Sequence, residues 1–180
     1  MPRMLDDLRR DHIDMARLLA IIEGQARLIG EGRPADLDLI ERSMDYFLGY
    51  PDLCHHPKED LLFQRAQQRD PAMAGRVARL TGQHAQLAVM TRHFADAVRQ
   101  VTLDYFVPRD RFAGMAAAYV KANRLHMQEE EGELFPEVER LFTAADWAEI
   151  DRAAERWPLF RSVVENRHLS LHQRILELSD

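Results

Sequence analysis

Apolar residues recur at steps of three and four along most of this chain, and a histidine lies in or beside the repeat of each long stretch. In the first stretch the series runs Leu8, His12, Met15, Leu19 and Ile22. These steps are typical of the buried face of an amphipathic helix. A histidine on that face needs a polar partner in the core, because an unpaired buried polar group is costly. The pattern therefore predicts a helical fold with imidazoles inside it.

The balance of residue types also favours helices. The chain has 22 leucines and 22 alanines, whereas valine, isoleucine and threonine together number 20. Leucine and alanine lose less side-chain freedom in a helix than β-branched residues do. Breaks near residues 30–34, 69–71 and 103–108 divide the chain into long stretches. We therefore expect an all-α protein, with an up-down-up-down four-helix bundle over residues 1–142 and one or two additional C-terminal helices over residues 143–180 packed on it.

Two of the expected helix starts carry capping residues. Asp36 follows the first break and is expected to begin the second helical stretch. Thr143, with Asp146 three residues on, resembles a capping box and is expected to begin the C-terminal region.

The charge of the chain argues against two classes of partner. The net charge is −6 and the isoelectric point is near 5.8, so neither nucleic acid nor an anionic membrane surface is attracted. No apolar run approaches the ~18 residues of a membrane span, and acids stand where a signal peptide has its apolar region. We expect a cytoplasmic protein that binds no nucleic acid and no membrane. The sequence names no protein partner.

Four histidines are expected to lie at one level of the bundle. Residues at equal distances from the turn of a helical hairpin lie side by side. For each consecutive pair among His12, His55, His84 and His126, the residue halfway between them falls in the break that joins their two helices. The four imidazoles are therefore predicted to meet.

Two of these histidines are followed by a glutamate four residues later, His55 by Glu59 and His126 by Glu130. A step of four turns only ~40° around a helix, so each acid lies on the face of its histidine. His12 precedes the first pair much as His84 precedes the second. The sequence therefore predicts an internal repeat, with two equivalent sets of ligands across a pseudo-twofold axis.

Four imidazoles and two carboxylates inside a core are stabilised most simply by metal ions. Iron, manganese and zinc all accept this mixture of ligands, and two carboxylates between two histidine pairs suit two bridged ions. No catalytic residue is predicted. The predicted metal ligands are His12, His55, Glu59, His84, His126 and Glu130.

These features resemble a known family. A histidine in the first helix, HHPKED on the second, a histidine in the third and HMQEEEGELFP on the fourth look like the hemerythrin-like, or HHE cation-binding, domain over residues 5–141. The resemblance implies two iron ions bridged by the carboxylates, with dioxygen or another small diatomic ligand as partner. It assigns His12 and His55 to one iron, and His84 and His126 to the other.

The chain departs from the oxygen-carrying members of that family at two places. They have a second histidine four residues after the first on the third helix, where this chain has Ala88. They place the last carboxylate five residues after its histidine, which here is Glu131. Since a step of five turns the side chain ~140° away, we favour Glu130 as the bridge.

Three functions remain open from the sequence. The first is a di-iron protein that binds or senses dioxygen, iron or nitric oxide. The second is a di-iron enzyme acting on peroxide or Fe(II), and the third is a helical interaction domain with a structural metal. We expect a binding protein rather than an enzyme. The remaining histidines, His56, His93, His168 and His172, are expected outside the ligand set.

Overall fold

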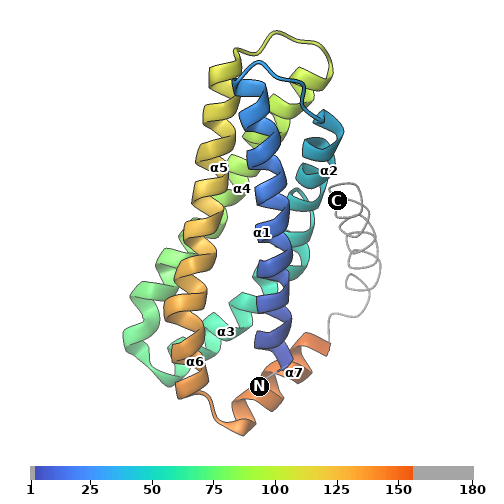
Figure 1. Ribbon diagram of the computed structural model, residues 1–180. Coiled ribbons are helices and arrows are strands. Elements are labelled where there is room, and N and C mark those ends of the chain that lie inside the picture. Colours follow the sequence, from blue (N-terminus) through green and yellow to red (C-terminus); the bar gives the residue numbers. More distant parts are fainter. Residues whose placement is uncertain (1–2, 156–180) are drawn as a thin grey trace.

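The computed structural model describes residues 3–155, and every regular element among them is helical. The predicted all-helical fold is thus confirmed, and the chain forms a helical bundle (Figure 1). The elements are α1 (Arg3–Gly30), α2 (Leu37–Phe47), the π-helical turn η1 (Pro51–His55), α3 (His56–Arg69), the 3-10 turn η2 (Pro71–Met73), α4 (Ala74–Thr102), α5 (Arg109–Glu129), the π-helical turn η3 (Glu130–Leu134), α6 (Phe135–Leu141) and α7 (Ala144–Glu155).

The long helices pack side by side, and the shorter ones extend or close the bundle. Helix α1 packs against α2 and α5, and α4 packs against the same two helices. Helices α2 and α3 follow one another along the bundle, as do α5 and α6, while α7 lies across the end near the N-terminus (Figure 1). The structure therefore brings the second and fourth histidine-bearing segments beside the first and third.

Local sequence explains where the first helices end and begin. Gly32 adopts a positive φ of 70° after α1, a conformation that glycine accepts without strain. The Asp36 side chain accepts a hydrogen bond from the backbone N–H of Leu39, so Asp36 caps α2 as predicted.

Two prolines explain the π-helical turns. A proline ring collides with the carbonyl four residues earlier in an α-helix. Pro57 and Pro136 each follow a π-helical turn by two residues, and the carbonyls they would strike, of Leu53 and Gly132, lie within those turns. The wider turn relieves the collision. Such turns are frequent at functional sites.

The core consists of two hydrophobic clusters with a polar layer between them. On α1, Leu8 belongs to one cluster and Met15 to the other, with buried His12 between them. The segment formed by α5 and η3 repeats this order, with Met127 in one cluster and Leu134 in the other. The histidines therefore lie in the middle of the bundle, shielded by apolar side chains on both sides.

A buried carboxylate fixes the start of α7. The backbone and hydroxyl of Thr143 both donate to Asp146 Oδ2 at 2.7 Å, and the Asp146 backbone returns a bond to the Thr143 hydroxyl at 3.3 Å. The predicted cap is thus confirmed. Arg65 and Arg69 on α3 each approach Asp146 Oδ1 to 2.7 Å, and Ile150 joins the cluster below the histidines. Asp146 thereby ties α7 to α3.

We expect Asp146→Asn to destabilise the protein by about 1–2 kcal/mol at neutral pH, because hydrogen bonds to a charged group are lost while both arginines keep some exposure to water. Burial alone raises the pKa of Asp146, but Arg69, Thr143 and Arg65 outweigh it and hold that pKa below its ordinary value. The stabilisation is therefore present above the ordinary pKa and lost as the pH falls below it. Urea unfolding of parent and variant should give a difference that shrinks between about pH 5 and about pH 2; a constant difference would contradict this.

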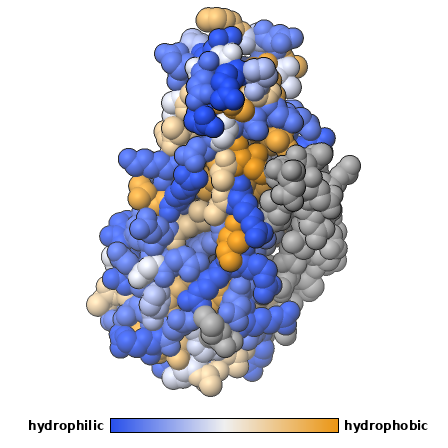
Figure 2. All heavy atoms as spheres, viewed as in Figure 1, coloured by the Kyte–Doolittle hydropathy of each residue, from blue (hydrophilic) through white to orange (hydrophobic). Residues whose placement is uncertain are grey.

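The distribution of polar residues on the surface is the one expected for amphipathic helices. On the face in Figure 2, hydrophilic residues cover most of the surface and apolar residues form smaller patches. Within residues 3–155, no helix combines the length and apolar character needed to cross a membrane. Trp157, Phe160, His168, His172 and the helix expected after Pro158 lie outside the described residues, and the division of the chain at residue 142 stays a prediction.

Candidate metal centre

The structure brings together all six side chains proposed as ligands. Each of them is less than 9% exposed, and both glutamates are fully buried. We call His12, His55 and Glu59 the first half-site, and His84, His126 and Glu130 the second half-site.

In the first half-site the two histidines face one point. Their Nε2 atoms are 3.1 Å apart. Glu59 Oε1 lies 3.0 Å from His55 Nε2 and 3.5 Å from His12 Nε2. The four-residue step from His55 to Glu59 thus places the acid beside its own histidine, while α1 supplies the other.

The second half-site shares its carboxylates with the first. Glu130 Oε2 lies 3.3 Å from His126 Nε2, and also 3.5 Å from His12 Nε2 in the first half-site. His84 Nε2 is 3.3 Å from Glu59 Oε2 and 3.5 Å from Glu130 Oε1. Each glutamate therefore reaches histidines of both half-sites, as carboxylates that bridge two ions must.

The donor atoms of this cluster suit cations. Among the described residues, 3–155, no hydrogen-bond partner reaches six buried atoms of the cluster: both oxygens of Glu59, both oxygens of Glu130, and Nε2 of His84 and of His126. Nitrogens and oxygens lie 3.0–3.5 Å apart, yet these atoms miss the alignment of a hydrogen bond. Leaving such groups unsatisfied is expensive, and the mixture of imidazole and carboxylate is one that iron, manganese and zinc bind. The residues present therefore fit metal ions.

Three of the four imidazoles have a hydrogen-bond acceptor at Nδ1, on the side of the ring away from the cluster. His12 Nδ1 is 2.9 Å from Glu131 Oε1, and His55 Nδ1 is 3.1 Å from Asp11 Oδ2. His126 Nδ1 is 2.8 Å from Gln83 Oε1. A neutral imidazole that donates from Nδ1 keeps the Nε2 lone pair for the cluster. The hydrogen bonds thus select the tautomer that can bind a metal ion.

The sequence reasoning missed two of these acceptors, Asp11 and Gln83. Each directly precedes the first histidine of its half-site, and each reaches the other histidine of that half-site. The signal that could have found them is this shared position in the internal repeat. From the sequence, Glu131 was expected to be either the alternative bridge or a surface charge. Its side chain is 35% exposed and binds His12 and Arg9 at the rim, whereas Glu130 is fully buried in the cluster.

Two phenylalanines cover the centre in a crossed arrangement. Phe63 of the first half of the repeat stacks on His84, with centroids 5.7 Å apart, and Phe135 of the second half stacks on His12 at 5.6 Å. The second half has one more residue between Glu130 and its Leu-Phe pair than the first half has after Glu59. The π-helical turn η3 spans that segment, and a turn of this kind absorbs one extra residue. The two halves of the repeat therefore keep equivalent positions for their phenylalanines despite the extra residue.

The sequence predicted that His56 would lie either behind the ligands or on the surface, and the structure places it beside the cluster. One of its ring nitrogens lies within 4.8 Å of donor atoms of Glu59, His84 and His126. Its ring stacks on His84 with centroids 3.9 Å apart and planes 13° apart, and its Nδ1 is 3.1 Å from Asp52 Oδ1. Two nearly parallel rings cannot both aim their lone pairs at one ion. In this arrangement His56 packs against His84 rather than joining the six proposed ligands. His93 is exposed on α4, as expected.

Burial and the carboxylates shift the pKa values of the histidines in opposite directions. Burial opposes the charged imidazole, but the neighbouring carboxylates outweigh it and raise the pKa of His12 to about 11 and that of His84 to about 9. At His126 burial prevails and lowers the pKa to about 4. Burial raises the pKa of Glu59, yet the surrounding histidines hold it well below its ordinary value. Because a metal ion binds neutral imidazole, loading the centre releases protons.

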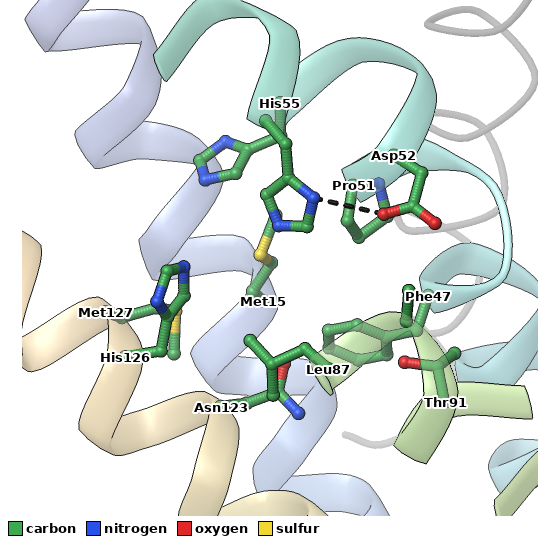
Figure 3. A pocket seen from close by; sticks show the side chains of 12 residues that line it. Met15, Phe47, Pro51, Asp52, His55, Leu87, Thr91, Asn123, His126 and Met127 are labelled. Carbon is green, nitrogen blue, oxygen red and sulfur yellow. Dashed lines mark hydrogen bonds and ion pairs between the residues drawn. The ribbon is translucent and has the colours of Figure 1, made fainter. Parts of the chain in front are cut away.

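A cavity of about 20 Å3 adjoins the centre (Figure 3). Such a volume is about that of one water-sized molecule. Figure 3 shows His55 and His126 together with the apolar side chains of Met15, Leu87 and Phe47 around this space. Ala88 also belongs to its wall. The cavity can thus hold a small molecule beside imidazoles of both half-sites.

Comparison with known proteins gives one match. Neither the curated proteins nor the solved structures include a match to this chain. The family model described as the hemerythrin HHE cation binding domain matches residues 3–138, which contain all six side chains of the cluster and most of the bundle. With its helical bundle and its buried cluster of histidines and glutamates, the chain belongs to the hemerythrin HHE cation-binding domain family.

Proposed function

We propose that this protein holds two iron ions in a carboxylate-bridged centre, inside an up-down-up-down four-helix bundle, and binds or senses dioxygen or another small diatomic molecule such as nitric oxide. The observation that carries the proposal is the buried donor set beside a cavity of about 20 Å3. When bound, the two ions would supply redox-active centres with coordination positions open to a small ligand. Manganese and zinc also accept this donor set.

The protein's own residues have three roles in this proposal. His12, His55, His84 and His126 hold the ions, and Glu59 and Glu130 bridge them. Asp11, Gln83 and Glu131 orient three of the imidazoles. The apolar wall of Met15, Leu87 and Phe47 excludes bulk water and limits the size of the ligand.

Ala88 in the cavity wall supports a second candidate, an enzyme that reduces peroxide or oxidises Fe(II). Where the oxygen carriers place another imidazole, this chain has a methyl group beside the cavity. Fewer protein ligands leave more positions open for a reacting molecule.

Metal analysis with optical spectroscopy tests the proposal. Protein purified without added chelator should contain two iron ions per chain, and its absorption should change reversibly between argon and oxygen or on addition of nitric oxide. Multiple turnovers with peroxide or Fe(II) would establish the enzyme instead. Two ions whose spectra respond to none of these molecules would overturn both candidates and leave a structural metal.

We expect Ala88→His to slow the reaction of the reduced, iron-loaded protein with oxygen, because the new side chain enters the cavity and lies only ~40° from His84 on α4. Stopped-flow absorption at equal iron loading measures the effect. Ala85→His is the matched control, since Ala85 is exposed on the same helix. If Ala88→His reacts with oxygen as fast as the parent and Ala85→His do, although its new imidazole is shown to bind iron, the lack of a histidine at position 88 does not control reactivity.

A further inference from the structure

The internal repeat places Asp11 and Gln83 at equivalent positions. Each precedes the first histidine of its half-site, and each accepts from Nδ1 of the second histidine, Asp11 from His55 at 3.1 Å and Gln83 from His126 at 2.8 Å. The two residues therefore orient equivalent imidazoles with different chemical groups. One is a carboxylate and the other is an amide.

The partners behind these two residues fix which atom is offered. Lys58 Nζ and the Tyr50 hydroxyl donate to Asp11 at 3.2 and 2.9 Å, which holds its carboxylate in place. Gln83 Nε2 donates to Glu129 Oε2 at 3.0 Å, so its amide presents oxygen to His126. The difference between the half-sites is thus built into their surroundings.

The second pair of equivalent positions increases this difference. Glu131 accepts from His12 at 2.9 Å. Asp60 holds the corresponding place after Glu59, but its side chain is one methylene shorter, and within residues 3–155 it forms no hydrogen bond to His84. Both imidazoles of the first half-site therefore donate from Nδ1 to a carboxylate. Among residues 3–155, neither imidazole of the second half-site does so from Nδ1.

A carboxylate behind an imidazole makes that imidazole a stronger donor to a metal ion, and removing such a partner typically weakens metal binding 10- to 100-fold. We infer that the two metal positions are unequal: the His12/His55 position binds its ion more tightly, and the His84/His126 position holds a weaker, exchangeable ion. This inference rests on the proposed dinuclear site. The weaker position empties first as free metal falls, so the chain can respond to metal supply while it retains one ion.

Titration of the metal-free protein with Co(II) tests the inference, because the visible absorption of Co(II) reports its ligands. The parent should bind two ions in steps that differ at least about tenfold in affinity. Asp11→Asn should weaken the tighter step by about 10- to 100-fold. The double variant Gln83→Glu/Glu129→Gln keeps the net charge but offers His126 a carboxylate, and it should strengthen the weaker step. Glu23→Gln is the control, since Glu23 pairs with Arg124 on the surface.

The outcomes separate this inference from the proposed function. Two equal steps in the parent, or separated steps that both variants leave unchanged, overturn the inference while two bound ions still support the proposed function. Failure of the parent to bind two ions overturns both. Tighter binding at the weaker step in the double variant supports the inference. This result cannot arise from misfolding, because a misfolded protein would bind metal more weakly.

Discussion

Glu59→Gln and Glu130→Gln should each lower the occupancy of both metal positions together. Each carboxylate lies within 3.5 Å of an Nε2 atom in both half-sites, so neither can be lost from one ion alone. We expect binding of both ions to weaken by at least about 100-fold, more than the loss of an orienting hydrogen bond would cause. Metal analysis after gel filtration at equal protein concentration measures the effect.

Glu131→Gln is the matched control for this prediction, since it changes the neighbouring acid at the rim. It removes a charge behind His12 but leaves an oxygen that can accept its hydrogen bond, and a smaller loss of metal is expected. A Glu131 variant that loses metal while the Glu130 variant retains it would assign the bridge to Glu131. Loss of a single ion from the Glu59 variant would contradict bridging by that residue.

The sequence predicted the helical fold because its periodicity and its breaks depend on local chemistry. Gly32 and Asp36 end one helix and begin the next through backbone preference and capping alone. Equal distances from the turns placed His12 and His126 at one level, since an antiparallel hairpin of regular helices leaves little choice of register. The six side chains lie together as that argument requires, and metal ligation by them stays a prediction.

The features that the sequence did not reveal depend on distances between helices. Asp11 adjoins His12 in the chain but binds His55 on another helix, which needs the spacing of the two helices and the rotamers of both side chains. His56 is a partial case. The sequence left open whether it lies behind the ligands or on the surface, and only the structure shows that it stacks on His84.

The cavity could not be read from the sequence for a similar reason. Its volume is what remains after residues from several helices have packed, and one methyl group more or less changes it. Ala88 was identified as a gap only by comparison with the oxygen carriers. Its place in the wall of a cavity of about 20 Å3 shows where the missing side chain leaves room.

Removal of the metal ions should destabilise the folded protein. A ligand that binds only the folded state contributes RT ln(1 + [L]/Kd), roughly 2.7 kcal/mol per site at a hundredfold excess over Kd. For a domain of this size we expect the melting temperature to fall by about 5–10 °C for each ion removed. The physical reason is that Glu59 and Glu130 are fully buried and, in the part of the chain that the structure describes, their oxygens have no hydrogen-bond partner. Thermal unfolding followed by circular dichroism, with and without chelator, measures the shift.

The double variant Glu59→Gln/Glu130→Gln distinguishes metal loss from a direct effect of the chelator. Its centre lacks both bridging charges, so chelator should leave its melting temperature unchanged. In the metal-free parent these carboxylates also pair with His12 and His84 and raise their pKa values, so their loss destabilises the variant by itself. The comparison is therefore made within each protein, with and without chelator. If the parent shows the same melting curve before and after verified metal loss, the ions contribute nothing to folding, and pairing of the two glutamates with protonated His12 and His84 is enough to stabilise the buried cluster.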